Sequence, residues 1–142
     1  MAEPVEQPTL ASFDELLAAA RTQEEPQRLL FVFARKFVDD HVSETERQQY
    51  RDQRGGLIQP CLCVDKTVDE VTNFGSLREE SERVGTYWWD IVFVSSMSGR
   101  GGIAPNSDEA VQPLQFMVNA INQGRTERMV AFDRHGQYLQ FA

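Results

Sequence analysis

Two uninterrupted apolar runs limit most strongly what this chain can fold into. The first is RLLFVFA at residues 28–34, and the second lies within WWDIVFVSSM at residues 88–97. Both are rich in aromatic and β-branched residues, and the first does not alternate with polar residues as a strand with one hydrated face would. We therefore expect residues 28–34 to be a strand buried on both faces and residues 88–97 to be a central strand.

Helical segments and further strands alternate with these runs. Ser12 and Glu15 have the spacing of a capping box and precede apolar residues at helical spacing. Pro60 cannot donate to a ladder, so we place the strand that contains it near an edge or at a bulge. The expected elements are a helix over 13–22, strands over 28–34, 57–65 and 88–97, a helix that begins at the Thr67–Glu70 capping box and ends at Gly85, a helix that becomes regular near Pro113 after a looser turn from Asn106 or Ser107 and ends at Gly124, and a final hairpin around Arg134-His135-Gly136.

This order predicts an α/β fold, with α+β as the alternative. We expect a single sheet of about five strands, mixed in direction, with three to four helices packed on it and a β-hairpin at its end. Residues 1–10 are expected to be a disordered lead, and residues 11–142 a single globular domain. Residues 43–54 have almost no apolar face, so they are expected to form either a solvated helix or a long connection.

The charge of the chain disfavours several classes of partner. The formal net charge is −8, and residues 1–55 and 56–142 each carry 11 acidic and 7 basic residues. We find no basic stripe for DNA or RNA, and anionic membrane surfaces are disfavoured for the same reason. No apolar run approaches the roughly 20 residues of a membrane span, and the N-terminus lacks the features of a signal peptide. We therefore expect a cytoplasmic protein.

Cys61 and Cys63 are the only cysteines, and they form a C-x-C within the strand expected over 57–65. A two-residue period puts both thiols on one face of that strand. A metal site would need further ligands, whereas the two histidines, His41 and His135, lie in polar, turn-like contexts. We expect reduced cysteines that fill the core, with no metal and no cofactor, and keep a redox or metal role as the alternative.

A glycine-rich stretch follows the second apolar run. Backbone N–H groups at a strand end with glycines, together with the dipole of a following helix, favour an anion. The P-loop lysine is absent, and the Rossmann spacing occurs only in its relaxed form, so a turn built for shape is the competing interpretation. The candidate residues for binding a phosphorylated ligand are Ser98, Gly99, Arg100, Gly101 and Gly102.

Lys66 joins this candidate ligand site under one condition. If the strands at 57–65 and 88–97 are parallel neighbours, Asp65, Lys66 and the glycine-rich stretch share one rim of the sheet. Otherwise Asp65 caps the following helix and Lys66 is solvated.

Two adjacent tryptophans are candidates for contact with a partner. Trp88 and Trp89 point to opposite faces of the expected strand, so we expect one in the core. The other would either pack at the edge of the sheet or be exposed and contact a partner. Ser95 and Ser96 lack an evident histidine base, and the G-x-S-x-G motif is absent. We therefore assign no catalytic residue.

Five longer stretches resemble a small family of one-domain bacterial proteins, found mostly in proteobacteria and frequently labelled ribonucleotide reductase subunit alpha. They are SFDELLAAARTQEEPQRLLFVFA, GGLIQPCLCVDKTVDEV, WWDIVFVSSMSGRGG, PLQFMVNAINQGR and FDRHGQ. The family has no established activity. The catalytic subunit of ribonucleotide reductase is a far larger barrel that needs three cysteines, whereas this chain has two cysteines in 142 residues. We interpret the label as misapplied and expect no such activity.

Two functions remain after these exclusions. The first is a non-catalytic interaction or accessory domain that binds a protein partner or associates weakly with itself. The second is a binder of a small anionic, phosphorylated ligand at residues 98–102.

Overall fold

One five-stranded sheet organises the chain. The computed structural model describes residues 12–36 and 58–140, and in them the strands lie in the order β2-β1-β3-β4-β5. The strands are β1 (Gln27–Lys36), β2 (Ile58–Thr67), β3 (Ile91–Ser98), β4 (Val130–Phe132) and β5 (Tyr138–Leu139). The expected five strands and the final hairpin are confirmed. The expected N-terminal lead and the segment 43–54 lie outside the described residues.

The expectation of a mixed sheet is wrong, because every pair of neighbouring strands is antiparallel. β2 and β3 do run in the same direction, but β1 lies between them and opposes both. The connection from β2 to β3 therefore crosses over one intervening strand. Strand order depends on pairing in three dimensions, which the alternation of elements along the chain does not encode.

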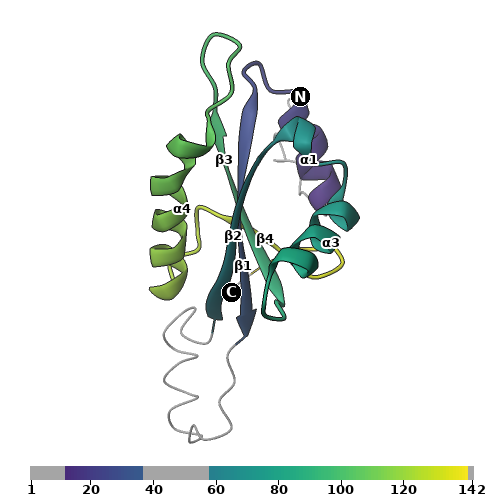
Figure 1. Cartoon of the computed structure of the whole chain (residues 1–142), viewed down its shortest axis with the longest axis vertical. Coiled ribbons are helices and arrows are strands. Elements are labelled where there is room, and N and C mark those ends of the chain that lie inside the picture. The colour runs from purple at the N-terminus through teal and green to yellow at the C-terminus, as the bar shows by residue number, and fades with distance from the viewer. Residues whose placement is uncertain (1–11, 37–57, 141–142) are drawn as a thin grey trace, which may run out of the picture.

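Helices cover both faces of this sheet. α1 (Phe13–Arg21) and α3 (Phe74–Val84) lie on one face and α4 (Ser107–Asn122) on the other (Figure 1). Along β1, odd-numbered residues such as Phe31 pack with the first pair of helices, and even-numbered residues such as Val32 pack with α4. The prediction that this apolar run is buried on both faces is confirmed.

The single helix expected between Thr67 and Gly85 is two separate elements. The Thr67–Glu70 capping box forms, but it begins only a short 3-10 helix, η1 (Val68–Glu70). Val71 then adopts an extended conformation, with φ −112° and ψ 114°, and Asn73 caps the start of α3. A second capping residue downstream of the first explains why the helical pattern is interrupted.

The last helix begins earlier than expected. Asn106 and Glu109 form a reciprocal capping box, so α4 starts at Ser107 and Pro113 lies inside it. An interior proline removes one helical hydrogen bond, a cost offset here by the burial of α4 against the sheet. The expected stop at Gly124 is confirmed by its φ of 73°.

A β-bulge separates the two cysteines. The register between β1 and β2 shifts between Phe33 and Ala34, so β2 has both features that Pro60 predicts, an edge position and a bulge. Cys61 packs against the core on the side of α1 and α3. Cys63 instead lies opposite Val32, whose side chain faces α4. The expectation that both thiols share one face is therefore wrong, because the extra residue resets the alternation.

The C-terminal hairpin turns at Gly136, which has a φ of 75° as expected for this position. The backbone there also passes close to the core. A Cβ atom at Gly136 would lie 2.9 Å from Cγ of Phe74. Gly101 has a φ of 60°, but a Cβ atom there would meet nothing within 4 Å.

We expect Gly136→Ala to lower the free energy of unfolding by about 3 kcal/mol, from backbone strain together with the clash. Gly101→Ala, which adds strain alone, should cost about 1 kcal/mol. Urea denaturation followed by circular dichroism measures both values. Equal losses in the two variants would contradict the close packing of the hairpin against Phe74.

Candidate functional site

The glycine-rich stretch is a tight hairpin turn. Arg100 N–H donates to the carbonyl of Ile103 at 3.0 Å, and Ile103 N–H donates to the carbonyl of Arg100 at 3.1 Å. The two central residues, Gly101 and Gly102, have φ values of 60° and 82°. Two consecutive positive φ values define the turn that matches the twist of antiparallel strands, and glycine adopts them without strain.

The amides at the tip of this turn already hold an anion, and it belongs to the chain itself. Gly101 N–H donates to Oε2 of Glu25 at 3.1 Å, and Gly102 N–H donates to Oε1 at 2.8 Å. The amide of Gly99, just before the turn, donates to the carbonyl of Pro26 at 2.8 Å. A phosphorylated ligand at these residues stays a prediction, and it would have to displace the Glu25 carboxylate.

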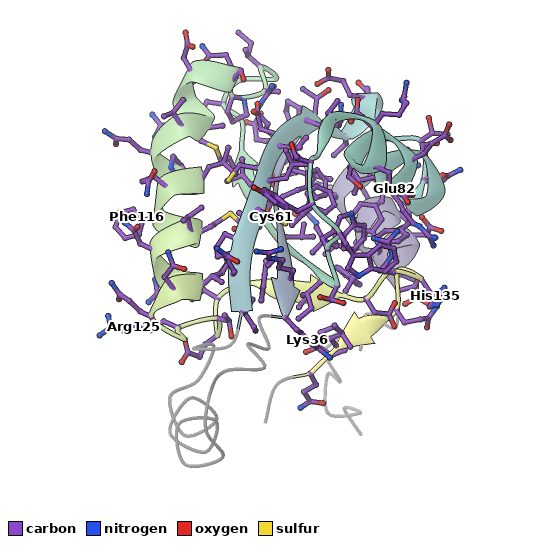
Figure 2. All side chains as sticks on the ribbon, turned by 60° about the horizontal axis from the view of Figure 1, so that its bottom comes forward. Lys36, Cys61, Glu82, Phe116, Arg125 and His135 are labelled. Atoms are coloured by element: carbon purple, nitrogen blue, oxygen red, sulfur yellow. The ribbon has the colours of Figure 1, made fainter. Side chains whose placement is uncertain are left out.

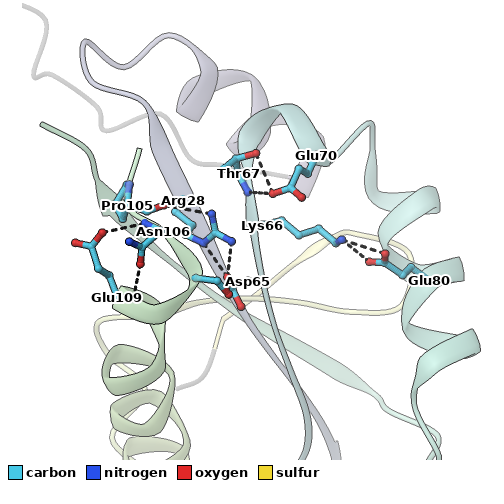
Figure 3. A network of polar contacts seen from close by, with 10 residues as sticks. Arg28, Asp65, Lys66, Thr67, Glu70, Glu80, Pro105, Asn106 and Glu109 are labelled. Carbon is cyan, nitrogen blue, oxygen red and sulfur yellow. Dashed lines mark hydrogen bonds and ion pairs between the residues drawn. The ribbon is translucent and has the colours of Figure 1, made fainter. Parts of the chain in front are cut away.

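Asp65 lies in a polar network that links β1, β2 and the start of α4 (Figure 3). The guanidinium of Arg28 approaches Oδ2 of Asp65 at 2.7 Å from Nε and at 2.6 Å from Nη2. Arg28 also donates to the carbonyl of Pro105 at 3.2 Å, and the Ser107 hydroxyl donates to Asp65 at 2.8 Å. Through Ser107 and Arg28, Asp65 therefore links the start of α4 to the sheet, and it does not cap η1.

Lys66 does not join the glycine turn. Its Nζ lies 3.0 Å and 2.8 Å from the two carboxylate oxygens of Glu80 on α3 (Figure 3). It borders a small pocket of about 150 Å³ whose lining includes no residue from 98–102. The condition for a shared rim is not met, because β1 separates β2 from β3.

One tryptophan is buried, as expected, and the other is exposed. Trp89 is 2% exposed, and its indole N–H donates to the Ser81 hydroxyl at 2.9 Å. Trp88 is 63% exposed, but its N–H donates to Asp90 at 3.1 Å and the Arg134 guanidinium lies 3.7 Å from its ring centroid. Both tryptophans precede β3 instead of lying within it. Of the two candidate contacts, only Trp88 is accessible at the surface, and a partner there stays a prediction.

Both cysteines are free thiols with a reduced tendency to ionise. Burial raises the pKa of the Cys61 thiol, and the nearby Arg35 partly offsets this effect. Cys63 is an exposed residue, so the expectation that both cysteines fill the core is wrong for it. The surrounding sheet still removes part of the hydration of its sulfur and raises its pKa as well. Over residues 12–36 and 58–140, no group of three or more His, Cys, Asp or Glu side chains is arranged to hold a metal ion.

The second half of β3 is an uncovered strand edge. β3 pairs with β1 along its whole length to Ser98, but on its other side β4 pairs only with Val92–Val94. Residues 91–94 are buried, whereas from Ser95 to Ser98 half-buried and exposed residues alternate. No described strand covers this edge beyond Val94. The change in sequence from IVFV to SSMS marks the same boundary.

Two pockets flank this edge, one on each face of the sheet. The methionine pocket, about 870 Å³, lies on the side of α4, and the α1 pocket, about 290 Å³, lies on the side of α1. Ser95, Ser96 and Arg128 border both. Phe116 lies on the outer side of α4 and Arg125 near its C-terminal end (Figure 2). The methionine pocket is also lined by Leu30, Met97, Gln112, Pro113, Phe116, Met117, Ala120, Arg125, Glu127 and Met129.

The packing of α4 explains why this region is open. α4 packs mainly over β1 and β2, and so leaves the face of β3 on this side of the sheet open. The chain that leads into β4 does not extend the sheet, because it turns at Thr126–Met129, where the Met129 amide donates to the Thr126 carbonyl at 3.1 Å. The sequence analysis named Ser98 only as a candidate ligand residue of the glycine-rich stretch, and it missed Arg125 and Arg128, which no local motif marks.

Comparisons with protein-family models, with curated proteins and with solved structures find no match for this chain. The resemblance to a small bacterial family therefore stays a prediction. In the described part of the chain, no helix is long and apolar enough to cross a membrane.

We expect Glu25→Ala to lower the free energy of unfolding by about 1 kcal/mol, because two charge-assisted hydrogen bonds at a partly exposed site are lost. Sulfate should stabilise this variant more than the unaltered chain, since two turn amides become available. Thermal unfolding with and without sulfate measures both effects. The control is Glu24→Ala, which removes a negative charge from the neighbouring residue. Identical behaviour of the two variants would rule out a specific role for Glu25.

We expect both thiols to react with iodoacetamide at pH 8 more slowly than cysteine in an unstructured peptide. The raised pKa leaves less of each thiol as the reactive thiolate at that pH. Mass spectrometry of peptides from timed samples reports Cys61 and Cys63 separately, and the same reaction in urea supplies the unfolded reference. Faster reaction in the folded chain would show that the local environment favours the thiolate.

Proposed function

We propose that this chain is a non-catalytic interaction domain that binds an extended segment of another protein along Ser95–Ser98 of β3. The observation that carries the proposal is the change along β3, from covered and buried to uncovered and accessible, while its pairing with β1 continues. An exposed strand edge binds an added strand through main-chain hydrogen bonds.

The hydrogen-bonding direction of β3 supports this mode of binding. Along an antiparallel ladder, successive residues direct their N–H and C=O groups to alternate sides. Gly99 N–H donates to the carbonyl of Pro26, in line with β1. By this alternation Met97 also faces β1, and Ser96 and Ser98 direct their backbone groups away from it, towards the uncovered edge.

Other surfaces support binding of a strand less well. β2 forms one outer edge of the sheet, but it contains Pro60 and a bulge, both of which disfavour pairing with another strand. β5, at the other end, spans only Tyr138–Leu139. Trp88 is exposed, but its indole N–H already donates to Asp90 and the Arg134 guanidinium already lies over its ring.

The alternative of anion binding at the glycine turn has weaker support, because the Glu25 carboxylate occupies the two tip amides. Neither pocket beside β3 is lined by a described histidine that would activate Ser95 or Ser96, which favours binding over catalysis. We place this interaction in the cytoplasm, where free thiols such as Cys61 and Cys63 are kept reduced. Membership of the small bacterial family is part of the same proposal.

The test is Ser96→Pro, which removes the outward N–H of Ser96 while leaving the groups that face β1 in place. Peptides selected on the full chain from a display library of random linear sequences should bind this variant at least about tenfold more weakly, since a hydrogen bond is lost and the ring blocks approach. Fluorescence polarisation measures the affinity, and circular dichroism confirms that the fold is retained.

Two controls make this test specific. Ser96→Ala keeps the backbone N–H and should bind the selected peptides as the unaltered chain does. Trp88→Ala changes the other candidate surface and should also leave the affinity unchanged. Loss of binding in Trp88→Ala, with retention in a folded Ser96→Pro, would place the interaction at the tryptophan and reject the β3 edge.

A further inference from the structure

The two pockets beside β3 differ in size and lining, which constrains the segment that would bind there. Successive side chains of an extended peptide point to opposite faces, so a strand along Ser95–Ser98 would place alternate side chains in the two pockets. The methionine pocket is about 870 Å³ and the α1 pocket about 290 Å³. The geometry therefore favours a larger side chain on the α4 side and a smaller one on the α1 side.

The methionine pocket suits an apolar side chain of variable shape. Met97, Met117 and Met129 line it together, and apart from Met1 they are all the methionines of the chain. Unbranched thioether side chains adjust to different occupants and make favourable contacts with aromatic rings. Phe116, 77% exposed on α4, adds an aromatic surface at the rim.

The α1 pocket is the smaller of the two, and residues of α1, β1, β3 and β4 line it. Its lining includes the apolar side chains of Ala19, Ala20, Val94 and Val130, together with Gln23. A short apolar or hydroxyl-bearing side chain fits such a lining better than an aromatic ring. Arg128 is the only charged residue among those that line this pocket.

The edge at Ser95–Ser98 and the two pockets beside it form one groove, and its rim carries two arginines in a chain whose net charge is −8. Arg125 and Arg128 border the methionine pocket, and Arg128 borders the α1 pocket as well. Both are exposed, and neither guanidinium forms a hydrogen bond or ion pair with another described residue. Glu127 lies on the same rim and has an interaction of its own, so the three charged residues of this rim carry two positive charges and one negative charge.

We infer that the groove selects an acidic, apolar strand from a partner protein. This strand places a bulky apolar side chain in the methionine pocket, a small side chain in the α1 pocket, and an Asp, a Glu or a C-terminal carboxylate against Arg125 and Arg128. The inference rests on the proposed function and adds the chemistry of the bound segment. Arginine pairs well with carboxylates because its planar fork donates two parallel hydrogen bonds.

The experiment is the same peptide selection, repeated on the unaltered full chain and on Arg125→Glu/Arg128→Glu. Peptides selected on the unaltered chain should be enriched in one bulky apolar residue and at least one carboxylate, and should bind the double variant at least about tenfold more weakly. Selection on the double variant should favour Lys and Arg in place of Asp and Glu. Arg83→Glu, on the opposite helical layer, should keep the acidic preference.

The outcomes separate this inference from the proposed function. Peptides that bind the unaltered chain, lose affinity in Ser96→Pro and show no preference for carboxylates would overturn the inference while leaving the binding mode in place. If no peptide depends on Ser96, both proposals fail. Sedimentation of the unaltered chain as a dimer that Ser96→Pro dissociates would identify a second copy as the occupant and overturn the inference.

Discussion

The pairing of β1 on both of its sides is the constraint on which the rest of the structure depends. β1 joins β2 and β3 in antiparallel register, and every residue from Leu29 to Ala34 is buried. Its side chains alternate between the two helical layers, and burial of a large apolar side chain contributes about 1.5–3 kcal/mol. One short apolar segment thus connects α1, α3 and α4 to a common sheet.

The position of β1 also determines which partners the polar residues at one end of the sheet bind. β2 and β3 run in the same direction, but they are separated by β1 and hence by about 10 Å. Residues at the start of β1 occupy the intervening space: Arg28 binds Asp65, and Glu25, just before the strand, binds the turn that follows β3. Asp65, Lys66 and the amides of Gly101 and Gly102, which resemble a ligand site in the sequence, therefore have partners within the chain.

Local patterns in the sequence predict much of the fold because they have local physical causes. Apolar runs predicted the strands, Ser12 the start of α1, and Gly136 the final turn. Strand order and the contact between Glu25 and Gly102 were not predictable, since the latter joins residues 77 positions apart. The candidate groove was partly visible as a change from apolar residues to serines in β3. Its arginines come from a loop whose position depends on packing.

An uncovered strand edge exposes a protein to pairing with the edges of other sheets, so its surroundings matter as much as its exposure. Here the edge lies between α1 and α4, because residues of both helices line the pockets beside Ser95 and Ser96. A broad sheet carries side chains and helices on its faces, which would collide with these two helices. A single extended segment is thin enough to enter between them. The two helices that flank this edge therefore restrict what can pair with it, which makes the edge better suited to selective binding than to aggregation.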